Sequence, residues 1–268
     1  MNHEEIFDQL WTDYTSQNPS ARKVYDLFTE RGETVINDHI AFRTFNDPRI
    51  NVDALSQVFL KTGYEESGHY NFEQKKLNAK HFEHKTDKNA PRVFISELRL
   101  EEFSEELQDI VKDSIDQIPD SYLLSDDLIF SGTVWGATSY NLYQKLRIES
   151  EYAAWLYAYG FRANHFTVSI NHLKSLPEIK QVNRFLKDNG FLINDSGGEI
   201  KGTPEELLEQ SSIKAGIISY KFREGEYNIP GCYYEFARRY PDNEGNLYSG
   251  FIAKSADKIF ESTNFYKK

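Results

Sequence analysis

Apolar and polar positions first follow a helical period and then change to an alternating one. Residues 1–32 carry apolar side chains at helical spacing in two stretches, separated by Asn18-Pro19-Ser20, and this predicts two helices. Residues 38–45 are rich in strand formers and are followed by the turn signal Asn46-Asp47-Pro48. The chain is therefore expected to pass from two helices into a strand.

A β-α-β-β-β order is predicted for the segment that begins with this strand. A helical pattern from Val52 to Leu60 stops at Gly63, and strand-like segments follow near residues 64–73, 76–85 and 91–99. Beyond them, the acidic amphipathic pattern of residues 101–122 predicts a connecting helix, and residues 149–160 predict another.

The same order begins again farther along the chain. Placing residues 164–168 on residues 38–42 fixes an offset of 126 residues, and at this offset Phe59-Leu60-Lys61 falls on Phe185-Leu186-Lys187. Agreement at one offset in two separate elements favours an internal repeat. The alternative is an α+β domain whose two strand-helix units only resemble each other.

The predicted fold class is α+β, with two βαβββ modules that form a partly open β-barrel and with additional helices. In the second module, an insertion from Gly197 to Gln210 is expected before two strands, near 213–223 and 231–240. We expect a single domain over residues 1–268, divided into N-terminal helices 1–32, a first module 33–100, a helical connection 101–160 and a second module 161–268.

Strand alternation places a histidine on the polar face of the first strand of each module. His39 and Arg43 share one face of the first strand, while the large apolar residues between them face the opposite way, toward helices. His165, Thr167 and Ser169 likewise share one face of the equivalent strand. The two histidines are therefore expected to line one concavity.

The last strand carries an acid within an aromatic run. Glu235 shares a face with Arg239, and a half-buried carboxylate is costly unless it is paired or bound to a metal. Taken alone, Glu235 is explained by a salt bridge to Arg238 or Arg239. Together with His39 and His165 it forms two imidazoles and one carboxylate with open positions, the facial triad of non-haem iron oxygenases. We expect these three residues to hold Fe(2+).

Three open positions on the metal suit a 2-oxo acid and O2. The carboxylate and ketone oxygens of the acid would take two positions and O2 the third, and Arg43 would supply a bidentate cation for a substrate carboxylate. Arg43 is thus the catalytic candidate, and the substrate-binding candidates are Arg43, Thr167, Ser169 and Arg239. Glu97, in the last strand of the first module, is left open as a fourth ligand or as an acceptor that orients a histidine.

Simpler interpretations exist for each of these residues. A single strand histidine is more often a hydrogen-bonded core residue, and Arg43 alone would pair with Asp38 or Glu97 at the rim. His81 and His84 have metal-ligand spacing, but they lie among lysines and are expected to be solvated.

Composition and charge limit the classes of binding partner that are expected. A net charge of −11 argues against nucleic acid and anionic membranes, which bind clustered cations. No segment approaches the roughly 20 apolar residues that span a bilayer. The acidic N-terminus lacks a signal-peptide pattern and the single cysteine, Cys232, cannot pair within the chain, so a cytoplasmic location is expected. The sequence does not indicate the oligomeric state.

Three segments carry a family resemblance. Asp-His-Ile-Ala-Phe-Arg-Thr at 38–44, Asn-His-Phe-Thr at 164–167 and Tyr-Glu-Phe-Ala-Arg-Arg at 234–239 make the sequence similar to the 2-oxoadipate dioxygenase/decarboxylase family, a distant branch of the vicinal oxygen chelate fold. The resemblance implies an Fe(II) site at the two histidines and Glu235, with substrate recognition by Arg43. It also implies conversion of 2-oxoadipate and O2 to 2-hydroxyglutarate and CO2.

Two other functions stay open at this point. The better-known family members are longer, so the metal chemistry is expected to carry over more safely than the identity of the oxo acid. A glyoxalase-like isomerase or lyase would keep the fold and use another metal, with a fourth protein ligand such as Glu97. A protein that binds a small anion without turnover would instead pair Glu235 with Arg239.

Overall fold

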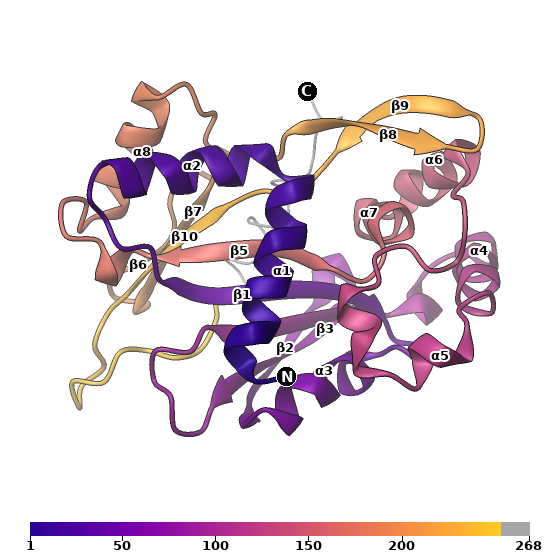
Figure 1. The fold of residues 1–268 in the computed structure, drawn as a ribbon, viewed down its shortest axis with the longest axis horizontal. Coiled ribbons are helices and arrows are strands. Elements are labelled where there is room, and N and C mark those ends of the chain that lie inside the picture. The colour runs from indigo at the N-terminus through magenta and orange to yellow at the C-terminus, as the bar shows by residue number, and fades with distance from the viewer. Residues whose placement is uncertain (253–268) are drawn as a thin grey trace.

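The computed structural model describes residues 1–252 and shows an α+β fold built on one strongly curled, open sheet (Figure 1). The sheet has eight strands in the order β2-β3-β4-β1-β5-β10-β7-β6. Its strands are β1 Asn37–Phe45, β2 Tyr64–Phe72, β3 Leu77–His84, β4 Arg92–Leu98, β5 Ala163–Ser169, β6 Lys201–Thr203, β7 Leu208–Ser212 and β10 Glu235–Arg239. The α-helices are α1 His3–Gln17, α2 Pro19–Glu30, α3 Val52–Lys61, α4 Glu105–Ile115, α5 Asp120–Leu123, α6 Tyr140–Glu149, α7 Glu151–Tyr159 and α8 Ile179–Asp188.

The predicted repeat is present in the sheet. The first module runs β1-α3-β2-β3-β4, and its strands are ordered β2-β3-β4-β1 with β1 parallel to β4. The second module has the matching order β6-β7-β10-β5, with β5 parallel to β10. Antiparallel pairing of β1 with β5 joins the two modules into one sheet. The predicted fold class is confirmed.

The strands of the second module differ from the prediction. The segment interpreted as an insertion, Gly197–Gln210, holds β6 and most of β7, whereas the predicted strand at 213–223 contains β8 (Ile217–Phe222). β8 pairs only with β9 (Gly225–Pro230) in a separate two-stranded sheet, so this hairpin is the insertion. β6 and β7 were missed because they are short and are joined by a polar turn that contains Pro204.

The apolar faces of the two central strands pack on helices, as alternation predicts. The ring of Phe42 on β1 lies 5.6 Å from that of Phe59 on α3. Phe166 on β5 is fully buried, with ring centroids 5.1 Å from Trp11 and 5.0 Å from Tyr14 of α1. These helices cover the convex side of the sheet, which leaves the concave side to the polar residues of the same strands.

Helix α7 is buried along most of its length and lies beside one end of the concave face. A helix that is apolar on all sides belongs in a core. Tyr152 fixes it to the sheet, because its hydroxyl contacts the backbone of Thr44 and the side chain of Ser96. The helix ends at Gly160, where φ is +66° and a Cβ atom would lie 2.0 Å from the carbonyl oxygen of Gly132.

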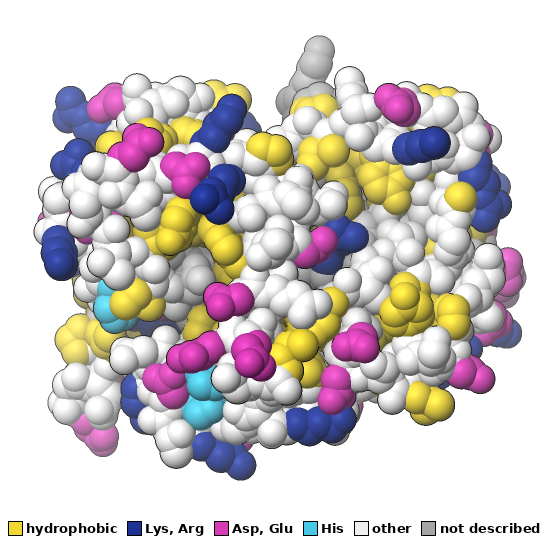
Figure 2. Space-filling model, in the orientation of Figure 1, with side chains coloured by type: hydrophobic (Ala, Val, Ile, Leu, Met, Phe, Trp, Pro, Cys, Tyr) yellow, Lys and Arg dark blue, Asp and Glu magenta, His cyan; other side chains and the backbone are white. Residues whose placement is uncertain are grey.

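The surface is mixed in charge. On the face seen in Figure 2, Lys and Arg side chains are interspersed with Asp and Glu. Within residues 1–252, no helix combines the length and the apolar character that a membrane crossing requires.

The packing of α1 on β5 predicts a large stability cost for Phe166→Ala. The substitution leaves a cavity under α1, and we expect the free energy of unfolding to fall by about 3–5 kcal/mol. Urea denaturation would measure it. Leu192→Ala, at a side chain that is 72% exposed, is the control and should change stability by less than about 0.5 kcal/mol. Equal effects of the two substitutions would contradict this packing.

Candidate metal centre

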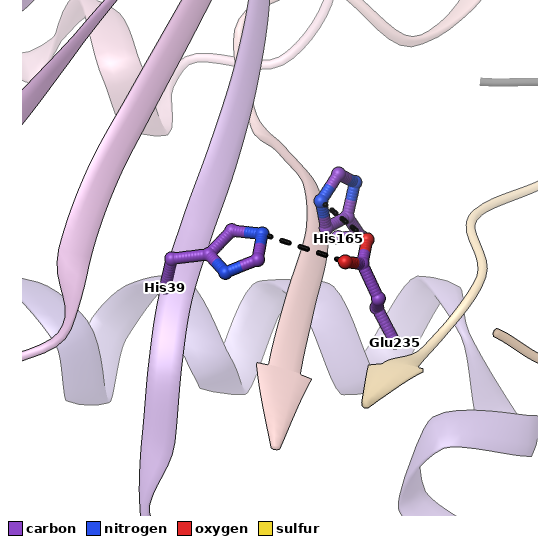
Figure 3. Close-up of side chains that lie close together, drawn as sticks. All are labelled: His39, His165 and Glu235. Atoms are coloured by element: carbon purple, nitrogen blue, oxygen red, sulfur yellow. Dashed lines mark ion pairs between the residues drawn. The ribbon is translucent and has the colours of Figure 1, made fainter. Parts of the chain in front are cut away.

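Three neighbouring strands bring His39, His165 and Glu235 together. In the register of the sheet, Thr167 lies opposite His39 on one side and opposite Glu235 on the other, and Ala41 lies opposite His165. The three functional side chains therefore surround Thr167 on one face. They point toward one another in Figure 3.

The ligand atoms of the three side chains converge. One ring nitrogen or carboxylate oxygen from each residue lies within 4.8 Å of the others, and the group is the one such cluster found within residues 1–252. His39 Nε2 is 3.7 Å from Glu235 Oε1, and His165 Nε2 is 3.2 Å from Glu235 Oε2. The two imidazole planes are nearly perpendicular, at 84°. All three side chains are buried.

The residue before each histidine orients its ring. Asp38 Oδ1 lies 2.8 Å from His39 Nδ1, and Asn164 Oδ1 lies 3.0 Å from His165 Nδ1. A carboxylate can only accept, so the Nδ1 of a neutral His39 carries the proton, and an amide oxygen favours the same tautomer for His165. Both Nε2 lone pairs are then directed into the site, as metal coordination requires.

The local chemistry fits a divalent cation. Glu235 Oε1 accepts a hydrogen bond from Gln210, but Oε2 is buried and has no hydrogen-bond partner among the described residues. Oε2 faces the Nε2 of His165, which is an acceptor in this tautomer. When Glu235 is ionised, two acceptors thus face each other in a buried site, and a cation between them stabilises this arrangement.

The protonation behaviour of the site follows from its burial. Burial raises the pKa of Glu235 to about 8. Burial, the His39 ring and the Arg43 guanidinium together hold the pKa of His165 well below its usual value, and burial also lowers that of His39. Both imidazoles are thus neutral near pH 7, the form that binds metals.

Arg43 lies at the other end of the same strand face. Its guanidinium lies over two rings of α7, with Cζ 4.9 Å from the Tyr152 centroid and 5.0 Å from the Trp155 centroid. These cation–π contacts fix a buried cation within the concave face. The two acids suggested as its partners have other contacts: the carboxylate of Asp38 is bound by Arg239, and that of Glu97 accepts the backbone N–H of Val52.

The contacts of Arg239 and Glu97 differ from those considered for them in the sequence. Arg239 binds Asp38 through two hydrogen bonds of 2.7 and 2.9 Å, rather than pairing with Glu235. The carboxylate of Glu97 accepts the backbone N–H of Val52, where it caps the start of α3. It is outside the cluster of ligand atoms, because the position on β4 that matches Glu235 is held by Phe94.

Thr167 and Ser169 line the site in different ways. The Thr167 hydroxyl lies 3.1 Å from His39 Nε2, at the centre of the triad. The Ser169 hydroxyl, one step along the same face, contacts His172 Nδ1 at 2.9 Å. Thr167 is therefore the one of the two that touches a ligand atom.

Sequence reasoning missed several residues around the site. Gln210 escaped notice because it was assigned to an insertion. His81 was expected to be solvated, but it is only 2% exposed and contacts the Tyr70 hydroxyl at 2.9 Å. His81 lies two residues from the apolar Ala79 on β3, and this spacing could have predicted a buried position. The flanking lysines favoured the opposite interpretation. Nothing in the sequence pattern indicated Phe251, whose ring lies 4.8 Å from that of His39.

Comparisons of the sequence with known proteins give a consistent result. The model of the 2-oxoadipate dioxygenase/decarboxylase family matches residues 6–129 and 127–243. The chloroplastic 2-oxoadipate dioxygenase/decarboxylase of Arabidopsis thaliana is 35% identical, over 96% of this chain and 76% of its own length.

Solved structures extend the comparison. Hydroxyglutarate synthase from Oryza sativa, solved with 2-oxoadipate, is 33% identical with a TM-score of 0.92, covering 97% of this chain and 91% of its own. A Shewanella frigidimarina protein provisionally described as a hydrolase is 51% identical with a TM-score of 0.89, covering 94% and 98%. A glyoxalase-superfamily protein from Ralstonia eutropha, at 19% identity and a TM-score of 0.73 over 90% and 83%, shares the fold. On the family match and these identities, the chain belongs to the 2-oxoadipate dioxygenase/decarboxylase family.

Proposed function

We propose that this protein is an Fe(II)-dependent dioxygenase that converts 2-oxoadipate and O2 to 2-hydroxyglutarate and CO2. The observation that carries the proposal is the convergence of two buried Nε2 atoms and a buried carboxylate with an unsatisfied oxygen. The names of the related plant enzymes, and the 2-oxoadipate bound to the rice enzyme, support the substrate and the reaction.

The ligand set supports iron over the metals of isomerases. Two histidines and one carboxylate leave positions open, and Fe(II) held there would bind the oxo acid and supply electrons to O2. A glyoxalase-like isomerase would be favoured by a fourth protein ligand, but Glu97 is bound to the start of α3. A non-catalytic anion-binding protein would pair Glu235 with Arg239, which instead binds Asp38.

Arg43 is proposed to bind the distal carboxylate of the substrate. It shares a strand face with His39 at a separation of four residues, or about 13 Å between Cα atoms. The long side chain of Arg43 covers part of this distance, and its charge acts on His165. A short dicarboxylate bound at the metal by its 2-oxo acid end would direct its distal carboxylate along this face toward the guanidinium. The planar donors of Arg43 match a carboxylate, and the rings of Tyr152 and Trp155 hold them in place.

Thr167 and Ser169 are proposed to contact the substrate near the metal. The Thr167 hydroxyl is within hydrogen-bonding distance of a ligand nitrogen, so metal binding at Nε2 would leave it available as a donor to an oxygen of the oxo acid. Ser169 lies one step farther along the face and would act at the edge of the site. Burial of the triad excludes bulk water from the reacting atoms.

Oxygen consumption tests the reaction directly. Protein reconstituted anaerobically with Fe(II) is expected to consume O2 and release CO2 in equal amounts with 2-oxoadipate, and to react less with other members of a 2-oxo acid panel. His165→Ala should lower the rate by at least about 1,000-fold, because it removes a metal ligand. Turnover of 2-oxoadipate in the absence of O2 would exclude the proposed chemistry.

Arg43→Lys tests the substrate site separately from the metal. An ammonium retains the charge but cannot reproduce the planar fork, so kcat/KM for 2-oxoadipate should fall by about 10- to 100-fold while Fe(II) affinity stays within about twofold. Calorimetry and steady-state kinetics measure the two effects. Arg238→Lys, whose guanidinium lies over Tyr240, is the matched control and should change neither. Loss of iron in Arg43→Lys would show that the residue maintains the metal centre instead.

Glu235→Gln separates metal binding from folding. The amide retains the size of the side chain but removes the charge, so Fe(II) affinity should fall by at least about 100-fold. The metal-free variant should be as stable as the metal-free parent, because the substitution removes a buried carboxylate that lacks a counter-charge. Thermal unfolding without metal checks this, and a strongly lowered Tm would mean that the carboxylate has a structural role.

A further inference from the structure

The chain returns to the concave face after its last strand. Phe251 is only 6% exposed, and its ring meets the His39 imidazole edge to face, with centroids 4.8 Å apart and planes at 89°. It also lies 4.8 Å from the ring of Phe94 on β4, and its backbone N–H donates to the Tyr70 hydroxyl at 3.1 Å. A segment that lies far from His39 in the sequence thus covers the His39 ring.

Arg239 contacts both this segment and the residue that orients His39. Two of its N–H groups donate to the carboxylate of Asp38, at 2.7 and 2.9 Å. Two more donate to the backbone carbonyl oxygens of Tyr248 and Gly250, each at 2.8 Å. Four of the five donors of a guanidinium are therefore occupied, which leaves little capacity for a substrate.

The charge on Asp38 depends on these contacts. Burial alone would raise the pKa of Asp38, but the nearby Arg239 guanidinium and the His39 ring hold it well below its usual value. An ionised, doubly hydrogen-bonded carboxylate has a fixed orientation, and it fixes the imidazole that donates to it. Arg239 and Asp38 are both buried, so the pair is shielded from solvent.

The second histidine shows that orientation alone does not require such a pair. His165 is oriented by a neutral amide, Asn164, at the equivalent position of the repeat. The charged pair on the His39 side has a feature that the amide lacks, namely the contacts of Arg239 with residues 248–250. This difference between the modules indicates that the Asp38–Arg239 pair does more than fix the tautomer of His39.

We propose that Arg239 is a positioning residue that couples the orientation of His39, through Asp38, to the placement of Phe251 over the His39 ring. This role rests on the metal-binding function proposed above and replaces the direct substrate contact expected for Arg239. The guanidinium holds the carboxylate with one edge and the chain segment with the other. The contacts of Arg239 then determine both the position of Phe251 over the metal site and the orientation of the His39 ring.

Arg239→Lys tests the coupling, because an ammonium cannot donate in both directions with the geometry of the guanidinium. Two readouts are needed: Fe(II) affinity by anaerobic calorimetry with the metal alone, and hydrogen exchange of the Phe251 amide in metal-free protein. We expect affinity to fall by about 10- to 100-fold and exchange to be at least about 10-fold faster. Arg238→Lys should alter neither, since its side chain lies outside these contacts.

Each outcome has a distinct meaning. If the parent protein binds no Fe(II), the proposed function fails. If the parent binds Fe(II) and either readout of Arg239→Lys matches the parent, the coupling is overturned while the function stands. Should this variant fail to fold, Phe251→Ala, which leaves the hydrogen bonds of the ligands intact, is expected to release iron to a chelator at least about 10-fold faster. An unchanged release rate would equally overturn the proposal.

Discussion

The antiparallel pairing of β1 with β5 is the interaction on which the rest of the structure depends. It joins the two modules, and its register places His39 opposite Thr167 and Ala41 opposite His165. Because side chains alternate along a strand, a shift of one residue would turn one histidine into the helices. Phe166 is packed under α1 and opposes such a shift, because the shift would expose this large aromatic side chain. The packing of the apolar convex face thereby fixes the positions of the polar side chains on the concave face.

The concave face contains groups that a core selected for stability alone would not hold. Glu235 is a fully buried carboxylate with one unsatisfied oxygen, and its raised pKa reflects the energetic cost. By contrast, the buried Asp38 has a bidentate partner in Arg239 and stays ionised. The charge of Asp38 is thus balanced by Arg239, whereas within residues 1–252 Glu235 forms ion pairs only with His39 and His165. This contrast supports Glu235 as the proposed metal ligand and Asp38 as the residue that orients His39, because burial is the same for both.

The sequence predicted those parts of the site that depend on local alternation. The faces of β1, β5 and β10 follow from period-two patterns, and the dipeptides Asp38-His39 and Asn164-His165, which share the histidine, marked equivalent positions of the repeat. Residues whose roles depend on distant partners could not be predicted. Arg239 and Asp38 are 201 positions apart, and no pattern at Arg239 distinguishes a bond to Asp38 from one to Glu235. The strands β6 and β7 were missed because their length and polarity resemble those of a loop.

The central claim is that one metal ion is held by side chains from three adjacent strands. Anomalous diffraction at the iron edge, from crystals reconstituted anaerobically with Fe(II), tests this claim most directly. The account predicts a single strong peak within about 2.0–2.2 Å of Nε2 of His39, Nε2 of His165 and a carboxylate oxygen of Glu235. A peak elsewhere, or an iron ion that lacks any one of these three ligands, would contradict it.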